Sequence, residues 1–359
     1  MTSSKPLVLL TGASGFLGYL TLVNLLKSGY RVRAVVRSQA KANKILTAPS
    51  LRDLDPSPET LLFSIISDLS IPGALDDAFR DVTYAIHVAS PVPAFGANHG
   101  PPTEEYDEYF VQNAVNIDVG LLKSAATVDS VRRVVFTSSC MAVVPFSYYA
   151  GGDVDYHVRF GPDSRTTNIA GPLGNDVQAY AAGKIAALNA VENWISETSQ
   201  KIKFDTITVV PGFIFGRNEL TESIEDLRVG STNSVLLSFL LGGQNEWPYN
   251  GNSVLGSDVA QVLVKVLKPE VEGNQSFITS KAITWEDALD TIRNHYPEAV
   301  SAGQLSATGK QPTLPIILDS SKTEKVLGIT FSTFEEQVRE VANQYLELHD
   351  ARQTASRTT

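Results

Sequence analysis

The segment Leu7-Val8-Leu9-Leu10-Thr11-Gly12-Ala13-Ser14-Gly15-Phe16-Leu17-Gly18 lies close to the N-terminus. Its apolar beginning predicts a buried parallel strand, and the glycines predict a tight turn into a helix. Gly12 can turn where a Cβ would clash, Gly15 lets the backbone approach a pyrophosphate, and Gly18 lets the helix pack closely on the strand. Because a helix that starts in this way points backbone N–H groups at a phosphate, the segment predicts a dinucleotide-binding unit.

Five further apolar segments predict the other strands of a Rossmann-type doubly wound parallel α/β sheet. They span residues 30–36, 61–66, 84–91, 133–139 and 204–210. After residue 220 the regular periods are lost and Asn, Gly and Ser accumulate, which predicts a smaller C-terminal substrate lobe. We expect a dinucleotide-binding domain of residues 5–219 with 256–280, a substrate lobe of 220–255 and 281–350, and a disordered tail at 351–359.

The composition is that of an ordinary globular protein, with 359 residues of which 43% are hydrophobic. The net charge is −10 and no long basic run occurs, which argues against nucleic acid and anionic membranes as partners. No apolar run approaches the roughly 18 residues that cross a bilayer, and we expect no cleavable leader before the first strand. The single cysteine, Cys140, excludes an internal disulfide and a multi-thiolate metal site. We therefore expect a cytoplasmic protein without a metal, acting as a monomer or homodimer.

The residue that follows the second predicted strand bears on the choice of dinucleotide. In this fold an Asp or Glu at that place binds the ribose 2′-hydroxyl of NAD. Here the residue is Arg37, and no carboxylate lies between Gly18 and Arg52. A guanidinium can bind a 2′-phosphate through charge-assisted hydrogen bonds, so the sequence favours NADPH. The alternative is a solvated Arg that begins a basic helix with Lys41 and Lys44.

A Tyr-x-x-x-Lys pattern predicts the chemistry. The fifth predicted strand ends in Thr137-Ser138-Ser139, and Tyr180-Ala181-Ala182-Gly183-Lys184 follows later in the chain. Four residues of separation on a helix place Tyr180 and Lys184 on one face. The Lys184 ammonium and an oxidised nicotinamide would lower the pKa of the Tyr180 hydroxyl, while Ser139 would hydrogen-bond a substrate carbonyl. Ser138 is the neighbouring candidate for the same role.

These segments, with Val88-Ala89-Ser90-Pro91 and Pro211-Gly212-Phe213-Ile214-Phe215-Gly216-Arg217, resemble the dihydroflavonol-reductase-like branch of the extended short-chain dehydrogenase/reductases. The resemblance covers Leu7 to about Gly216 and, thinly, Gly256 to Leu346. It implies Ser139, Tyr180 and Lys184 as catalytic residues, supported by Asn116 from a helix. The implied cofactor contacts are Thr11, Gly12, Ser14, Gly15, Phe16, Leu17, Gly18, Arg37, Asp68, Leu69, Ala89, Ser90, Tyr180, Lys184, Pro211 and Gly212.

Some of these residues also have a plainer interpretation. Asp68 could cap a turn, and Asn116 could be a helix amide that faces water. His87 lies inside the fourth predicted strand and is more typical of a buried core histidine than of a catalyst. Cys140 is more typical of packing than of a nucleophile.

Aromatic side chains are expected to line the substrate site. The candidates are Phe95, Phe146, Tyr148, Tyr149, Phe213 and Phe215. Basic residues are scarce among them, so the site would desolvate a phosphate or carboxylate without a partner, whereas burial of a neutral apolar ketone is favourable. Core packing is the alternative for some of these rings.

The sequence thus predicts an NADPH-dependent reductase of a neutral, hydrophobic aldehyde or ketone, with Tyr180 as the proton donor. One alternative is a sugar-nucleotide epimerase or dehydratase with retained NAD, which the missing acidic residue after the second strand disfavours. A non-catalytic dinucleotide sensor is the other alternative, and the Tyr-x-x-x-Lys pattern disfavours it.

Overall fold

A seven-stranded sheet forms the centre of the computed structural model, which describes residues 5–93 and 100–358. The strand order is β11-β7-β5-β4-β1-β2-β3, and all neighbouring strands are parallel. Its strands are β1 (Leu7–Thr11), β2 (Arg31–Val36), β3 (Leu61–Ile65), β4 (Tyr84–His87), β5 (Arg133–Thr137), β7 (Asp205–Pro211) and β11 (Gln275–Thr279). This arrangement confirms the predicted doubly wound α/β sheet.

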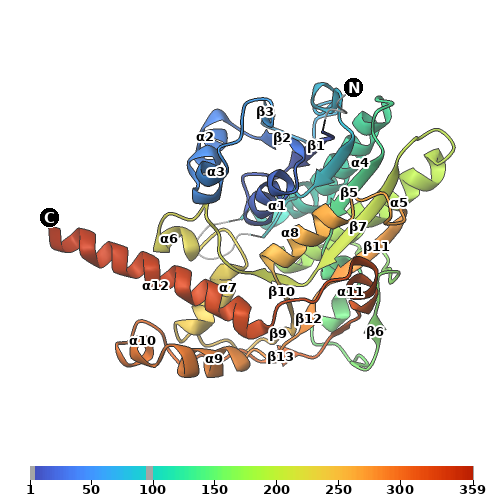
Figure 1. The fold of residues 1–359 in the computed structure, drawn as a ribbon. Helices are drawn as coiled ribbons and strands as arrows, with labels where there is room; N and C mark the ends of the chain where they lie inside the picture. The colour runs from blue at the N-terminus through green and yellow to red at the C-terminus, as the bar shows by residue number, and fades with distance from the viewer. Residues whose placement is uncertain (1–4, 94–99, 359) are drawn as a thin grey trace.

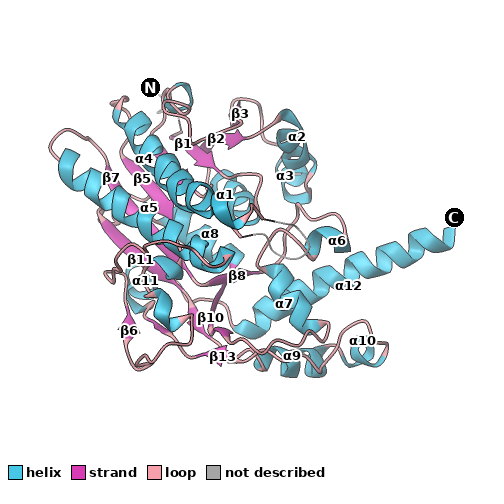
Figure 2. Ribbon diagram, turned by 180° about the vertical axis from the view of Figure 1, so that it is seen from behind, coloured by secondary structure: helices cyan, strands magenta, loops and turns pink. Residues whose placement is uncertain are grey.

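Helices cover both faces of the sheet (Figures 1 and 2). They include α1 (Phe16–Lys27) and α8 (Gly256–Lys265), which pack on each other, and α4 (Asn113–Ala126) and α5 (Asp176–Thr198), which form the second pair. Alternate residues of β1 serve the two layers, because Val8 and Leu10 belong to one core with α1 and α8, whereas Leu7 and Leu9 belong to the other with α4. A strand that is buried on both faces must be apolar throughout, which explains its sequence.

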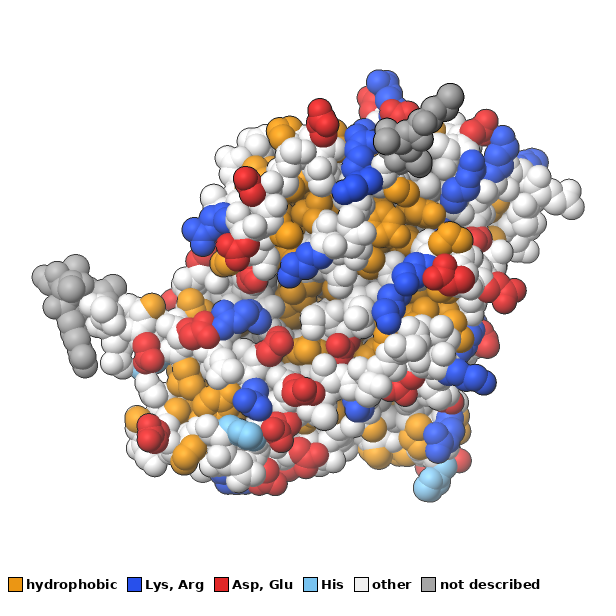
Figure 3. Space-filling model, in the orientation of Figure 1, with side chains coloured by type: hydrophobic (Ala, Val, Ile, Leu, Met, Phe, Trp, Pro, Cys, Tyr) orange, Lys and Arg blue, Asp and Glu red, His pale blue; other side chains and the backbone are white. Residues whose placement is uncertain are grey.

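Smaller elements follow the second strand or make up the C-terminal part of the chain. They are α2 (Gln39–Thr47), α3 (Pro49–Leu54), β6 (Arg159–Phe160), β8 (Phe213–Phe215), α6 (Ile224–Leu227), α7 (Asn233–Leu240), β9 (Tyr249–Asn250), β10 (Asn252–Leu255), β12 (Lys281–Ala282), α9 (Asp287–His295), α10 (Pro297–Ser301), β13 (Thr313–Leu314), β14 (Ile317–Leu318), α11 (Ser321–Leu327) and α12 (Phe334–Thr358). No helix in the described residues is both long and apolar enough to span a bilayer. On the face drawn in Figure 3, acidic and basic side chains are interspersed, so neither sign dominates it.

A second apolar core surrounds Trp285, whose side chain is fully buried. The ring centroids of Phe215 and Phe239 lie 5.8 and 6.2 Å from the ring centroid of Trp285. The ring centroid of Phe334 lies 6.4 Å from that of Phe215. Phe215 has no exposed surface, which corrects our expectation that it lines the substrate site. The reason is that β8 pairs with β10, and this pairing turns Phe215 toward the core around Trp285.

The C-terminal helix α12 differs from the disordered tail that we expected at 351–359. It begins with a capping box, in which Glu336 N–H donates to Thr333 Oγ1 at 3.2 Å and Thr333 N–H donates to the Glu336 carboxylate at 2.6 Å. The helix then continues to Thr358 and projects from the body of the molecule (Figure 1). Residues 351–358 contain no Gly or Pro, and Arg352 donates to Glu225 at 2.7 Å, so nothing ends the helix earlier.

Candidate active site

The predicted site residues gather at the carboxyl edge of the sheet. Thr11 ends β1, Ser139 follows β5, and Gly212 follows β7. Because these strands are parallel and β4 lies between β1 and β5, the segments that leave them meet at one edge. The carboxyl edge of an open α/β sheet is where ligands bind.

The glycine turn after β1 fits the pyrophosphate of a dinucleotide. Gly12 has a φ of +75°, and a Cβ there would lie 2.7 Å from the backbone nitrogen of Ala89. A Cβ on Gly18 would lie 1.9 Å from the carbonyl oxygen of Gly12, so both positions require glycine. α1 starts at Phe16 without a side-chain cap and without an acidic residue in its first turn. Its first N–H groups therefore suit an anion.

The residues of this turn differ in what they can offer. Ser14 is half-buried and Gly15 is exposed, whereas the Leu17 side chain belongs to the core and leaves only its backbone for a ligand. Thr11 ties the turn to the end of β4, since its Oγ1 accepts hydrogen bonds from the N–H groups of Val88 at 3.2 Å and Ala89 at 3.3 Å. Val88 and Ala89 are consequently held beside the turn.

The two residues expected near the adenosine lie at the ends of β2 and β3. Arg37 is exposed directly after β2, and no carboxylate among the described residues forms an ion pair with it. Asp68 is exposed and accepts from the Ser70 N–H at 2.8 Å and the Ser70 hydroxyl at 2.6 Å. These two hydrogen bonds lower the pKa of Asp68, which acts as a turn cap. Leu69 is half-buried against the core.

Ser139, Tyr180 and Lys184 come together where β5 ends beside α5. Ser139 is buried and caps a short 3-10 turn, since its Oγ accepts from the Met141 N–H at 3.3 Å. The Lys184 Nζ lies 5.8 Å from the centroid of the Tyr180 ring and donates to the Thr137 carbonyl at 3.3 Å. The four-residue spacing therefore places both side chains on one face of α5, as predicted.

The pKa of the Tyr180 hydroxyl is raised in the protein alone. Burial raises the pKa of Tyr180 to about 12, although a hydrogen bond with Ser139 acts in the opposite direction. Burial also lowers the pKa of Lys184, while the charge of Asp118 raises it. In the protein alone, desolvation therefore has the largest effect on the pKa of Tyr180. Tyr180 carries its proton at neutral pH and is suited to donate it.

Gly183, between Tyr180 and Lys184, sets how closely α5 approaches its neighbour. A Cβ at this position would lie 2.2 Å from the carbonyl oxygen of Phe110, which belongs to the π-helical segment η3 (Asp107–Gln112). The close approach fixes α5 against the helix that follows the loop after β4. The sequence contained this glycine, but the partner that requires it is distant in the chain.

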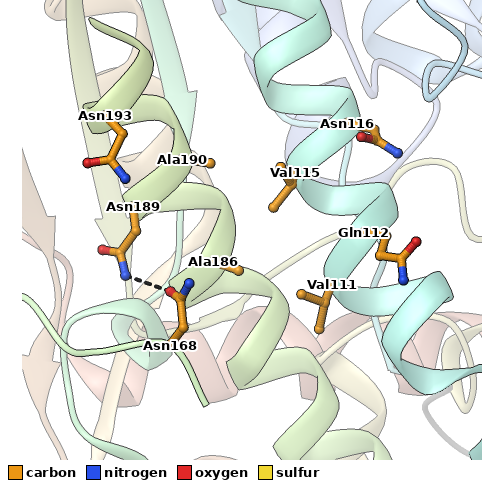
Figure 4. Close-up of a pocket in the computed structure, with 9 residues that line it drawn as sticks. All are labelled: Val111, Gln112, Val115, Asn116, Asn168, Ala186, Asn189, Ala190 and Asn193. Atoms are coloured by element: carbon orange, nitrogen blue, oxygen red, sulfur yellow. Dashed lines mark hydrogen bonds between the residues drawn. The ribbon is translucent and has the colours of Figure 1, made fainter. Parts of the chain in front are cut away.

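Asn116 does not join the other three catalytic candidates. It is exposed on α4 and lines an open cavity of about 400 Å³ between α4 and α5, together with Asn189 and Asn193 (Figure 4). Asp118 occupies the opposite face of α4 and lines a small cavity with Lys184. The sequence could have indicated that Asp118 lies on the buried face of α4, because Ala114, Asp118 and Leu121 recur there at helical spacing.

The aromatic candidates separate into core residues and partly exposed ones. Phe95 lies outside the described residues. Tyr148 is buried edge-on against Phe160 at 5.0 Å, and its hydroxyl donates to the Asp155 carbonyl, so it is a core residue and not the substrate contact that we expected. Phe146, Tyr149 and Phe213 keep some exposure.

The hydroxyl of Tyr149 is buried and has no hydrogen-bond partner among the described residues. Burial raises its pKa, and the neighbouring Cys140 and Tyr180 act in the same direction. Cys140 is itself buried, with its sulfur accepting from Asn250 Nδ2 at 3.4 Å, and burial raises the pKa of its thiol. Cys140 therefore packs as a neutral thiol, as the plainer interpretation expected. No group of three His, Cys, Asp or Glu side chains within the described ranges could hold a metal ion.

Comparison with known proteins identifies the family. Residues 8–252 match the model of the NAD dependent epimerase/dehydratase family. The chain is 37% identical to ketoreductase CTB6 from Cercospora nicotianae, with 96% of each chain covered. It is 30% identical to ketoreductase sphI from Aspergillus fumigatus, covering 96% of this chain and 98% of that one.

Among solved structures, the chain is similar to yeast methylglyoxal/isovaleraldehyde reductase Gre2 complexed with NADPH. The TM-score is 0.79 and the sequence identity is 26%, covering 96% of this chain and 99% of the yeast chain. The glycine turn, the Ser139–Tyr180–Lys184 arrangement and these matches agree with one another. The chain belongs to the NAD dependent epimerase/dehydratase family and is an oxidoreductase of the extended short-chain dehydrogenase/reductase group.

Proposed function

We propose that this protein reduces a neutral, hydrophobic ketone or aldehyde with NADPH, and that Tyr180 donates a proton to the carbonyl oxygen. The observation that carries the proposal is the meeting of Ser139, Tyr180 and Lys184 at the same edge of the sheet as the glycine turn. The similarity to two ketoreductases and to an NADPH-bound aldehyde reductase supports it. The cytoplasm is the compartment that we propose, since one buried cysteine suits reducing conditions.

Different residues bind the different parts of NADPH. N–H groups from Gly12 to Leu17 hold the pyrophosphate, and Arg37 binds the 2′-phosphate. Lys184 binds the nicotinamide ribose, with Ala89, Ser90, Pro211 and Gly212 nearby. Asp68 and Leu69 lie at the adenine end. When bound, NADPH supplies the hydride.

Proton transfer then depends on the side chains alone. The Ser139 hydroxyl donates a hydrogen bond to the substrate oxygen and stabilises the charge that develops on it. Tyr180 enters the reaction protonated because its pKa is raised to about 12. As the oxygen becomes an alkoxide, it is basic enough to take this proton.

Arg37→Asp should change the preferred dinucleotide. The variant removes a cation and places a carboxylate beside the 2′-phosphate, so the preference for NADPH over NADH should fall by about 1–3 kcal/mol, or about 5- to 150-fold in the ratio of Kd values. Fluorescence titration with both dinucleotides measures this ratio. Lys41→Asp, which reverses a charge on the following helix, is the matched control and should change the ratio less. Equal binding of NADH and NADPH by the wild type would contradict the role of Arg37.

The substrate class can be tested with matched neutral and anionic carbonyl compounds. Phe146, Tyr149 and Phe213 offer partly exposed rings, and burial of an apolar substrate against them contributes about 25 cal/mol per Å². We expect kcat/KM to be higher for the neutral compound, and Phe213→Ala to lower it about tenfold for a bulky ketone. A preference for phosphorylated or nucleotide-linked substrates would instead favour a sugar-nucleotide epimerase or dehydratase.

A further inference from the structure

A buried hydrogen bond joins the residue before the glycine turn to the end of β4. Thr11 Oγ1 and His87 Nδ1 lie 2.8 Å apart, and both side chains are buried. Since Thr11 Oγ1 already accepts from the N–H groups of Val88 and Ala89, its own proton is the one directed at His87. Nδ1 of His87 is therefore the acceptor, and the ring proton of a neutral His87 sits on Nε2.

Asp118 lies at the other side of the His87 ring. Its Oδ1 is 3.0 Å from His87 Nε2, and the two side chains are 19% and 2% exposed. Nε2 therefore lies beside the carboxylate, but it has no hydrogen-bond partner among the described residues. Asp118 comes from the buried face of α4, whereas His87 ends β4, so the contact joins the helix layer to the sheet.

Asp118 and Lys184 line the same small cavity. The cavity has about 10 Å³ and is also lined by Thr137, Ser138 and Thr208 and by apolar side chains from β5 and α5. This is close to the volume that one water molecule needs. No carboxylate within residues 5–93 and 100–358 lies within 4.0 Å of Lys184 Nζ, so Asp118 acts on the ammonium across the cavity. A buried ammonium requires such a compensating charge to remain protonated.

We propose that Asp118 is a positioning residue whose carboxylate, in contact with His87 and across a small cavity from Lys184, pairs with the Lys184 ammonium for binding of the dinucleotide ribose. The inference rests on the proposed function, because it concerns the binding of NADPH. It links the phosphate-binding turn to the active-site lysine through three side chains. The titratable groups around Lys184 are Asp118 from α4, Tyr180 from α5 and, behind Asp118, His87 from β4. Thr137 and Ser138, at the end of β5, and Thr208, in the middle of β7, do not titrate.

The test is the Kd for NADPH measured by fluorescence from pH 6 to pH 10, which does not depend on turnover. In the wild type, affinity should fall as Lys184 loses its proton at alkaline pH. Asp118→Asn keeps the shape but removes the charge that raises the pKa of Lys184. In this variant, the fall in NADPH affinity at alkaline pH should therefore begin about one pH unit lower than in the wild type. In Asp118→Glu, the fall in affinity should return most of the way to its wild-type pH. Asp129→Asn, which alters an exposed pair with Lys203, should leave the fall at its wild-type pH.

His87→Asn separates orientation from charge. It leaves the Asp118 carboxylate in place, so the alkaline fall should move by less than half of the shift in Asp118→Asn, while affinity is weakened a few-fold throughout. An unshifted fall in Asp118→Asn would overturn the inference, as would a uniform loss of affinity that follows a lowered Tm. If the wild type fails to bind NADPH at all, the proposed function fails and takes this inference with it. If the wild type binds and only the shift is missing, this inference alone fails.

Discussion

Tyr180→Phe is expected to lower turnover by about 100-fold or more while the affinity for NADPH stays nearly unchanged. The variant keeps the ring on α5 and removes only the hydroxyl, which burial keeps protonated at neutral pH. Lys184→Ala should reduce both turnover and affinity, because the ammonium is proposed to bind the ribose. The measurements are kcat on a verified carbonyl substrate and Kd for NADPH.

Tyr296→Phe is the matched control for this variant. The Tyr296 hydroxyl donates to Asn343 at 2.7 Å on the exposed side of α12, so its removal should leave both constants unchanged. If Tyr180→Phe retains turnover near that of the wild type, Tyr180 is not the acid. Ser139 would then be the next group to test, since its hydrogen bond acts on Tyr180.

The sheet and the glycine turn could be predicted because their patterns are local. Four consecutive apolar residues predict a strand that is buried on both faces, and the structure gives Leu7 and Val8 to different cores. Gly12 and Gly18 are required by contacts within the same turn or with the adjacent β4. The spacing of Tyr180 and Lys184 likewise follows from one helix.

Features that depend on contacts distant in the chain were not predictable in this way. Phe215 resembles a substrate contact in sequence, but β10 and Trp285 place it in a core. Asp118, and not Asn116, faces Lys184 because of how α4 is rotated against the sheet. The pKa of Tyr180 in the protein alone was not predictable either, since the extent of desolvation depends on the surrounding packing.

The opposite edge of the sheet contains a buried ion pair that should matter for stability and not for catalysis. Arg133, at the start of β5, donates to both carboxylate oxygens of Asp205 at the start of β7, at 2.5 and 2.8 Å. The same guanidinium donates to the carbonyls of Val266 at 2.6 Å and Val271 at 2.7 Å, which follow α8. Arg133 is 6% exposed, so its charge depends on these partners.

Asp205→Ala is therefore expected to lower the free energy of unfolding by about 3 kcal/mol, because it leaves a buried guanidinium without its counter-charge. The loss of unfolding free energy should lie near the lower end of the range for breaking a buried ion pair, because the backbone carbonyls still accept hydrogen bonds from Arg133. Denaturant unfolding measures it, and Asp129→Ala, which breaks the exposed pair with Lys203, should have little effect. Because Asp205 lies at the amino end of β7, the Kd for NADPH of the folded variant should match the wild type. Equal stability losses in the two variants would show that the ion pair does not hold β5, β7 and α8 together.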